Sequence, residues 1–195
     1  MTNLAAFPVR RYSGGAMFFH WSMALLIAAV GIVGLLFDDM PKGFKGQMIN
    51  LHAVFGCVIL VLLAGRVWWR VTHRPPPLPA RTGRFNRQAS ALGHLVLYAL
   101  MGLVPLAGLV YQFARARGID FGLFQIAPLL DQKLAFARTL GNAHSLSAYV
   151  LLVLAAGHIV AALAHQYVMK DQLLARMMPA AKTADVAAPV SLKSS

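Results

Sequence analysis

The sequence predicts an all-α, integral membrane four-helix bundle. The chain has 195 residues, of which 58% are hydrophobic and only 12% are charged, whereas soluble domains carry about 25% charged residues. Its mean hydropathy is +0.63. Four apolar stretches are each long enough to cross a bilayer, which takes about 20 helical residues. Histidines lie inside these stretches, where an unpartnered imidazole is costly, and four of them, His20, His52, His144 and His158, are the first candidates for function.

The four predicted spans are separated by turn and breaker residues, and they show no strand-like alternation. The first span is too long for a cleaved signal peptide and is predicted to be anchored by Arg10 and Arg11. The proline-rich segment 74–79 predicts a stiff, extended link. The connection 114–142 is the longest, and its stretch 129–140 suggests a short amphipathic piece. The predicted spans are 16–37, 48–69, 91–113 and 143–168.

Lysine and arginine are distributed unevenly between the two sides of these spans. Because the cytoplasmic side is the more basic one, the side with twelve such residues is expected to be inside, together with both termini. The segment 1–15 is then a cytoplasmic N-terminus, 16–178 is the membrane domain, and the polar tail 179–195 is predicted to be disordered. The twelve are Arg10, Arg11, Arg66, Arg70, Arg74, Arg81, Arg84, Arg87, Lys170, Arg176, Lys182 and Lys193.

The formal net charge of +12 would also suit a nucleic-acid partner. The basic residues flank apolar runs, however, and form no folded polar face. We therefore expect membrane lipid, and no nucleic acid, to be the partner of this charge.

The depths of the four histidines group them in pairs. His52 and His144 lie near the predicted outer face, and His20 and His158 lie near the inner face. The fourteen residues from His144 to His158 span about 21 Å of helix and return the side chain to nearly the same face. Each pair comes from two helices, as is needed to clamp a flat macrocycle between axial imidazoles. The pattern predicts two bis-histidine haem sites.

Zinc or copper is the competing interpretation of these histidines. A closed zinc site needs four ligands at one place, usually including cysteine or carboxylate. No span has a carboxylate in its middle, and Cys57 is the only cysteine. Haem therefore explains the pattern better than a bare metal ion.

His94 and His165 lie near the predicted cytoplasmic ends of the third and fourth spans. Either could be a ligand of the inner haem in place of His20 or His158. Either could instead hydrogen-bond a haem propionate or a quinone carbonyl, or simply face water and lipid headgroups.

Several motifs together resemble bacterial cytochrome b561, the four-helix di-haem b membrane cytochromes, and most nearly the superoxide oxidase type. The likeness covers about residues 12–179, although the connection between the third and fourth spans matches poorly. The resemblance implies an outer haem on His52 and His144 and an inner haem on His20 and His158. The motifs are NLH at 50–52 with Gly56 and Arg66, LGHLVLY at 92–98, VPLAGL at 104–109, and LAHQY at 163–167 with the segment 170–179.

The resemblance implies a superoxide:ubiquinone oxidoreductase of the bacterial inner membrane, with two haems b and ubiquinone as acceptor. Superoxide is an anion and a one-electron donor. Six basic residues in the predicted outer loops, against four aspartates, give a mild attractive field, although the same charges could merely anchor the loops to lipid. The six are Lys42, Lys45, Arg115, Arg117, Lys133 and Arg138.

The predicted quinone site lies at the cytoplasmic ends of the spans, with His94, His165 and Arg87 as candidates. Two other functions stay open at this point. The chain could be a cytochrome subunit that transfers electrons between a partner dehydrogenase or hydrogenase and the quinone pool. It could also be a non-redox membrane packing or transport protein, which would contain no haem.

Overall fold

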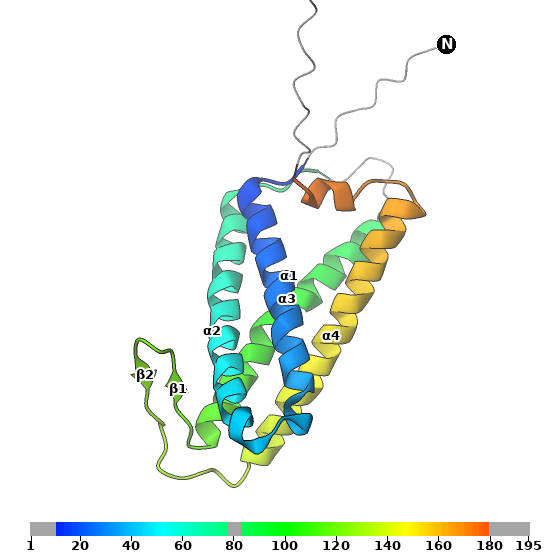
Figure 1. Cartoon of the computed structure of the whole chain (residues 1–195). Coiled ribbons are helices and arrows are strands. Elements are labelled where there is room, and N and C mark those ends of the chain that lie inside the picture. Colours follow the sequence, from blue (N-terminus) through cyan, green and yellow to red (C-terminus); the bar gives the residue numbers. More distant parts are fainter. Residues whose placement is uncertain (1–10, 78–82, 180–195) are drawn as a thin grey trace, which may run out of the picture.

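Four long helices, joined in sequence order, form an up-down-up-down bundle in the computed structural model, which describes residues 11–77 and 83–179 (Figure 1). We call the end at which both described chain ends lie the terminal end, and the opposite end the loop end. The helices are α1 (Gly14–Leu35), α2 (Lys42–Thr72), α3 (Arg84–Ala114) and α4 (Ala137–Tyr167); the shorter elements are η1 (Phe37–Asp39), β1 (Ile119–Asp120), β2 (Gln125–Ile126) and η2 (Leu174–Met177).

The four predicted spans are confirmed as helices long and apolar enough to cross a membrane. Three of them begin six or seven residues earlier than predicted, at Lys42, Arg84 and Ala137. The added turns contain lysine, arginine, glutamine and alanine, which are good helix formers. The helical hydrogen bonding therefore continues beyond the apolar part of each span.

The connection between α3 and α4 differs from the prediction. It contains an antiparallel hairpin in which Ile119 pairs with Ile126. Its strands are only two residues long, which is too short for an alternating pattern to appear in the sequence. The amphipathic piece predicted over 129–140 is wrong as a separate element, because the chain is irregular up to Phe136 and its remainder is the first turn of α4.

Large apolar side chains cover the outside of the bundle. Leu25, Val61 and Val153 are each more than 70% exposed. A soluble monomer rarely exposes so much apolar surface, whereas lipid covers it at no cost. The buried core is correspondingly small and joins all four helices; it consists of Met23, Ile59, Met101, Val104 and Leu151.

The helices pack unevenly around the bundle. Contacts run along α1 with α2, α2 with α3, and α3 with α4, whereas α1 and α4 touch only sparsely. One of their few close approaches is at Gly31, where an added methyl group would lie 2.8 Å from Leu152. The sparse contact leaves room inside the bundle on the side of α4.

The segment after α4 closes the terminal end. Arg176, only 5% exposed, donates to the carbonyl oxygens of Pro76 and Pro77 at 3.0 and 2.8 Å. Trp21 donates to the carbonyl of Met177 at 2.8 Å, and Arg11 to that of Met178 at 3.2 Å. Beyond position 179, the tail predicted to be disordered lies outside the described residues. The same holds for four basic residues predicted to lie on the inner side: Arg10, Arg81, Lys182 and Lys193.

Candidate functional site: two levels of histidines

The first candidate site is a pair of imidazoles at the loop end. His52 of α2 and His144 of α4 face each other with ring centroids 6.0 Å apart and ring planes inclined at 86°. Nδ1 of His144 lies 3.0 Å from the carbonyl oxygen of Val104. Because a carbonyl only accepts, Nδ1 carries the proton of the neutral ring and Nε2 keeps a free lone pair. This orientation would suit His144 for metal ligation through Nε2.

Glycines on the neighbouring helices make room for both rings. A methyl group at Gly34 of α1 would lie 3.2 Å from Cε1 of His52, and one at Gly108 of α3 would lie 2.9 Å from Cε1 of His144. Each imidazole therefore packs directly over backbone. Both glycines fix the ring positions in a way that alanine would disturb.

The polar atoms of His52 are only partly satisfied. Its Nδ1 is buried and makes no hydrogen bond with the described residues, although the Val30 backbone lies near the ring. Phe37 packs edge-on against it, with centroids 5.2 Å apart. Buried polar atoms without a close hydrogen bond are few in native structures, and the Val30 backbone is the polar group nearest to hand for this one.

Three histidines, rather than two, gather toward the terminal end. His20 of α1 and His158 of α4 have ring centroids 6.4 Å apart. His94 of α3 lies closer to His158, with centroids 5.3 Å apart. His158 therefore has two imidazole neighbours from two different helices.

The hydrogen bonds of His20 and His94 place their ring protons differently. Arg66 donates to Nδ1 of His20 at 3.1 Å and to the Tyr98 hydroxyl at 2.8 Å. Since a guanidinium only donates, Nδ1 of His20 accepts and the neutral ring carries its proton on Nε2. His94 donates from Nδ1 to the carbonyl of Ser90 at 2.6 Å, which leaves its Nε2 free. Metal ligation by His20 through Nε2 thus requires its contact with Arg66 to change.

A cavity of about 1060 Å³ extends from the buried core to the loop end. His52 and His144 line it, and so do Gly34, Gly56 and Gly108. Its volume is at the upper end of the range for small-molecule sites. The six predicted outer basic residues also line this cavity: Lys42, Lys45, Arg115, Arg117, Lys133 and Arg138.

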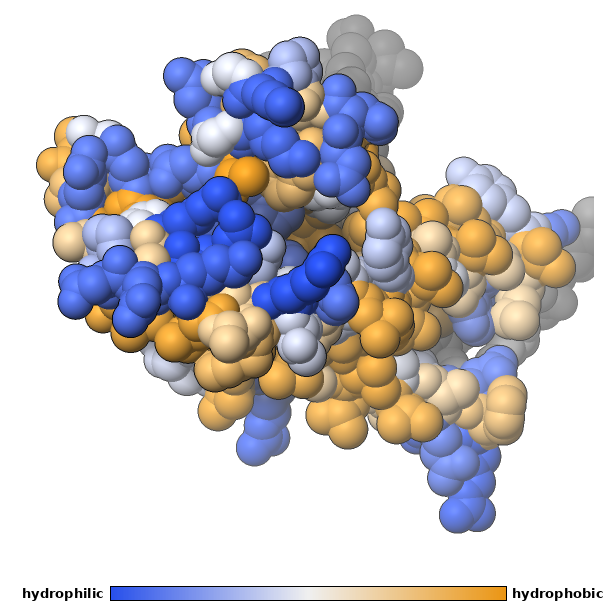
Figure 2. Space-filling view, turned by 90° about the horizontal axis from the view of Figure 1, so that it is seen from below, coloured by the Kyte–Doolittle hydropathy of each residue, from blue (hydrophilic) through white to orange (hydrophobic). Residues whose placement is uncertain are grey.

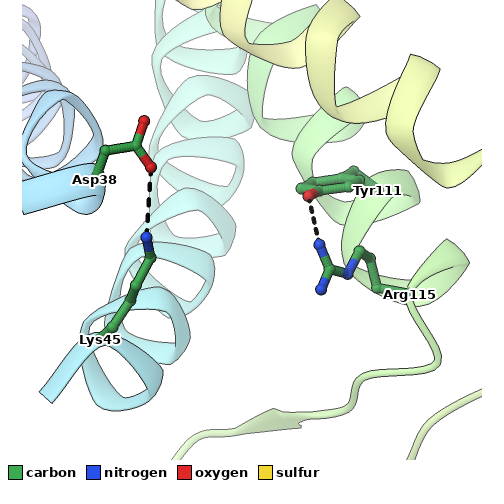
Figure 3. Close-up of polar contacts among 4 residues, drawn as sticks. All are labelled: Asp38, Lys45, Tyr111 and Arg115. Atoms are coloured by element: carbon green, nitrogen blue, oxygen red, sulfur yellow. Dashed lines mark hydrogen bonds and ion pairs between the residues drawn. The ribbon is translucent and has the colours of Figure 1, made fainter. Parts of the chain in front are cut away.

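Polar side chains surround the loop end, whereas the flanks of the bundle are apolar (Figure 2). Two of the basic residues are held by neighbours, as Figure 3 shows. Lys45 pairs with the exposed Asp38 at 3.4 Å. Arg115 donates to the Tyr111 hydroxyl at 3.0 Å and stacks over its ring. The entrance is therefore basic, and two of its basic side chains contact neighbouring side chains.

The three predicted quinone residues have different surroundings. His94 belongs to the terminal-end histidine cluster. His165, near the end of α4, lies 2.6 Å from the carboxylate of Asp171, and the side chains are 20% and 24% exposed. Arg87 is exposed near the start of α3. Asp171 was not singled out from the sequence as a functional residue. It could have been noticed because the chain has only six acidic residues.

Comparison with known proteins gives the family of this chain. The model of prokaryotic cytochrome b561 matches residues 11–180, which includes both levels of histidines. The chain belongs to the prokaryotic cytochrome b561 family. It is accordingly an inner-membrane, b-type cytochrome that transfers electrons and binds haem b.

Curated relatives cover nearly the whole chain. "Cytochrome b561 homolog 2" of Escherichia coli K12 is 31% identical over 172 residues, which is 86% of this chain and 91% of the relative. "Probable superoxide oxidase CybB" of Yersinia pestis is 31% identical over 172 residues, 87% of this chain and 97% of the relative. "Cytochrome b562" of Cereibacter sphaeroides is 32% identical over 168 residues, 82% and 89% respectively.

The loop-end pair of this cytochrome fits haem b well. Two imidazoles on opposite faces of one metal, each bonded at about 2 Å, place their ring centres roughly 6 Å apart. The observed 6.0 Å between His52 and His144 satisfies this condition, and the adjoining cavity supplies volume. At the terminal end, the 6.4 Å between the ring centroids of His20 and His158 satisfies the same condition. The contact of Arg66 with Nδ1 of His20 does not suit a ligand.

Proposed function

We propose that this cytochrome is a superoxide:quinone oxidoreductase with two haems b. His52 and His144 would hold one haem, and His20 and His158 the other. The separation of 6.0 Å between the ring centroids of His52 and His144, beside a cavity open toward a basic entrance, is the observation that carries the proposal. Haem b held by two histidines would supply one-electron transfer rather than oxygen binding.

The loop end is proposed to face the periplasm. This follows from the sequence, which predicts twelve basic residues for the inner side against six for the outer loops. Superoxide formed outside the cytoplasm would then meet the basic entrance first. The charges that line the cavity raise the local concentration of an anion and accelerate its arrival.

Quinone reduction is proposed for the terminal end. One quinone takes up two electrons, from two superoxide anions, and two protons, which gives one quinol and two molecules of dioxygen. His165 and Asp171, joined at 2.6 Å, form a pair that can hold a proton beside the apolar surface from which a quinone would approach. His94 and Arg87 are further candidates at the same end. The name of the Yersinia pestis relative supports the superoxide part of this proposal.

The test is rapid mixing of the purified holoprotein with superoxide, with and without a soluble ubiquinone analogue. Without quinone, the haem absorbance should shift to its reduced form and stay there. With quinone, it should return to the oxidised form as quinol accumulates. Haem that superoxide leaves oxidised would refute the proposed donor, and reduced haem that quinone leaves unchanged would refute the proposed acceptor.

A matched pair of triple variants tests the basic entrance. Lys42, Arg117 and Lys133, all exposed at the loop end, are replaced by glutamine; in the control, Arg74, Arg84 and Lys170, exposed at the terminal end, are replaced in the same way. The first variant should be reduced by superoxide several-fold more slowly and should lose most of its salt dependence, because the steering field is gone. Equal rates in the two variants would remove the steering argument.

A further inference from the structure

One surface of the molecule is not explained by electron transfer. We call residues 119–126, which comprise β1, β2 and the turn between them, the lateral hairpin. It lies beside the lower part of α2 rather than across the loop end of the bundle (Figure 1). Its turn points back along α2 toward the middle of the bundle.

An asparagine of α2 fixes the level of the lateral hairpin. Asn50 donates to the carbonyl of Asp120 at 2.7 Å and accepts from its backbone N–H at 2.9 Å. Asn50 comes eight residues after Lys42, the first residue of α2, and so lies about 12 Å up this helix. It precedes His52 by two residues, within the apolar span predicted to begin at 48. The base of the hairpin is therefore already level with the membrane-spanning part of α2.

The tip of the lateral hairpin is apolar and outward-facing. The ten residues 121–130, FGLFQIAPLL, contain no charged side chain. Leu123 is 97% exposed and Phe124 is 60% exposed. Phe121 stacks on Phe124 with ring centroids 4.7 Å apart, which stiffens the tip. Exposed apolar side chains at this level indicate contact with something other than water.

Several polar groups of the tip are paired within the hairpin. Phe121 donates from its backbone to the carbonyl of Phe124 at 2.9 Å. The carboxylate of Asp120 accepts from the N–H of Gly122 at 2.8 Å and from the side chain of Gln125 at 3.0 Å. These pairings lower the cost of leaving water, and the remaining backbone groups of the turn are expected to lie at the level of the hydrated headgroups.

We propose that the tip of the lateral hairpin inserts into the lipid leaflet at the loop end. Leu123 and Phe124 contact phospholipid acyl chains just below the headgroups, as the apolar residues of interfacial segments do. Lipid is the occupant that the observations favour, because the tip is uncharged and level with the span of α2. The insertion holds the connection between α3 and α4 beside the bundle, so that the basic entrance stays uncovered.

The test measures how fast single cysteines react with a water-soluble maleimide. In a Cys57→Ser background, Leu123→Cys is compared with Gln132→Cys, which is exposed in the same connection, and with Val61→Cys, which is exposed at mid-height on α2. The holoprotein is placed in phospholipid nanodiscs at one copy per disc, and haem absorbance verifies folding. Leu123→Cys should react at least roughly tenfold more slowly than Gln132→Cys and approach Val61→Cys, because the reactive thiolate does not form in lipid.

Two results would overturn the proposal. A cysteine at 123 that reacts as fast as the one at 132 would place the tip in water. Protection that appears only in discs holding two copies would make a second copy of the chain the occupant instead of lipid. Protection at one copy per disc that persists when the lipid chain composition is varied supports insertion.

Discussion

Gly108 and His144 form a close backbone-to-ring contact between α3 and α4. A methyl group at position 108 would lie 2.9 Å from Cε1 of His144, whose Nδ1 is 3.0 Å from the Val104 carbonyl. A helical side chain covers the turn that precedes it, so a residue larger than glycine at 108 would cover the carbonyl of Val104. The absence of a side chain at 108 thus lets the imidazole reach its acceptor.

Gly108→Ala should therefore weaken the loop-end haem site. The added methyl group displaces the ring of His144 and lengthens its hydrogen bond to Val104. We expect the haem-to-protein ratio, measured as the pyridine haemochrome, to fall clearly below that of the unchanged protein. Gly93→Ala is the control, since it lies on the same helix and a methyl group there meets nothing within 4 Å. Alanine favours a helix over glycine by about 0.5–1 kcal/mol, and this effect is the same in both variants. An equal loss of haem in the two would therefore contradict the explanation by the contact with His144.

His144→Ala should remove one haem and spare the other. The two levels of histidines are separated by about 21 Å along α4, and the buried core lies between them. We expect the haem-to-protein ratio to fall from two to one while the helical circular dichroism is kept. A ratio that stays at two would refute the assignment of the loop-end pair.

His20→Ala and His94→Ala together decide which ring is the partner of His158. With His20 as the ligand, His20→Ala loses the terminal-end haem and His94→Ala keeps it. The low-spin absorbance and the haem content distinguish the two variants. The opposite result would make His94 the ligand, since its hydrogen bond to the Ser90 carbonyl leaves Nε2 free. It would also explain why Arg66 can donate to His20.

Arg176→Met should destabilise the terminal end. It removes the donor to the carbonyls of Pro76 and Pro77, and hydrogen bonds from a charged group contribute about 1.5–3 kcal/mol each. We expect thermal unfolding at a lower temperature and faster proteolysis after α4. Arg84→Met, at an exposed position, is the control; an equally large effect there would point to charge rather than to these contacts.

Local patterns were enough to predict the parts of the fold that depend on one helix at a time. The lengths of the apolar runs predicted the four spans, and the rise per residue placed His144 and His158 at different levels. Contacts between distant segments could not be predicted in this way. Arg66 meets His20 across 46 residues and Asn50 meets Asp120 across 70. The approach of His94 to His158 depends on how α3 is rotated about its axis, which a uniformly apolar span does not specify.

Asp171→Asn should slow quinone reduction without changing the haem content. Asparagine keeps a hydrogen-bonding group near His165 but removes the carboxylate that lies 2.6 Å from its ring. If the pair supplies a proton to the reduced quinone, the loss of proton transfer should lower quinol formation by about tenfold or more. Reduction of haem by superoxide, measured in the same preparation without quinone, should stay the same, because the entrance proposed for superoxide lies at the other end of the bundle. Asp171→Glu should restore part of the rate. Quinol formation that is unchanged in Asp171→Asn would mean that His165 and Asp171 only fasten the end of α4, and that the proton comes from elsewhere.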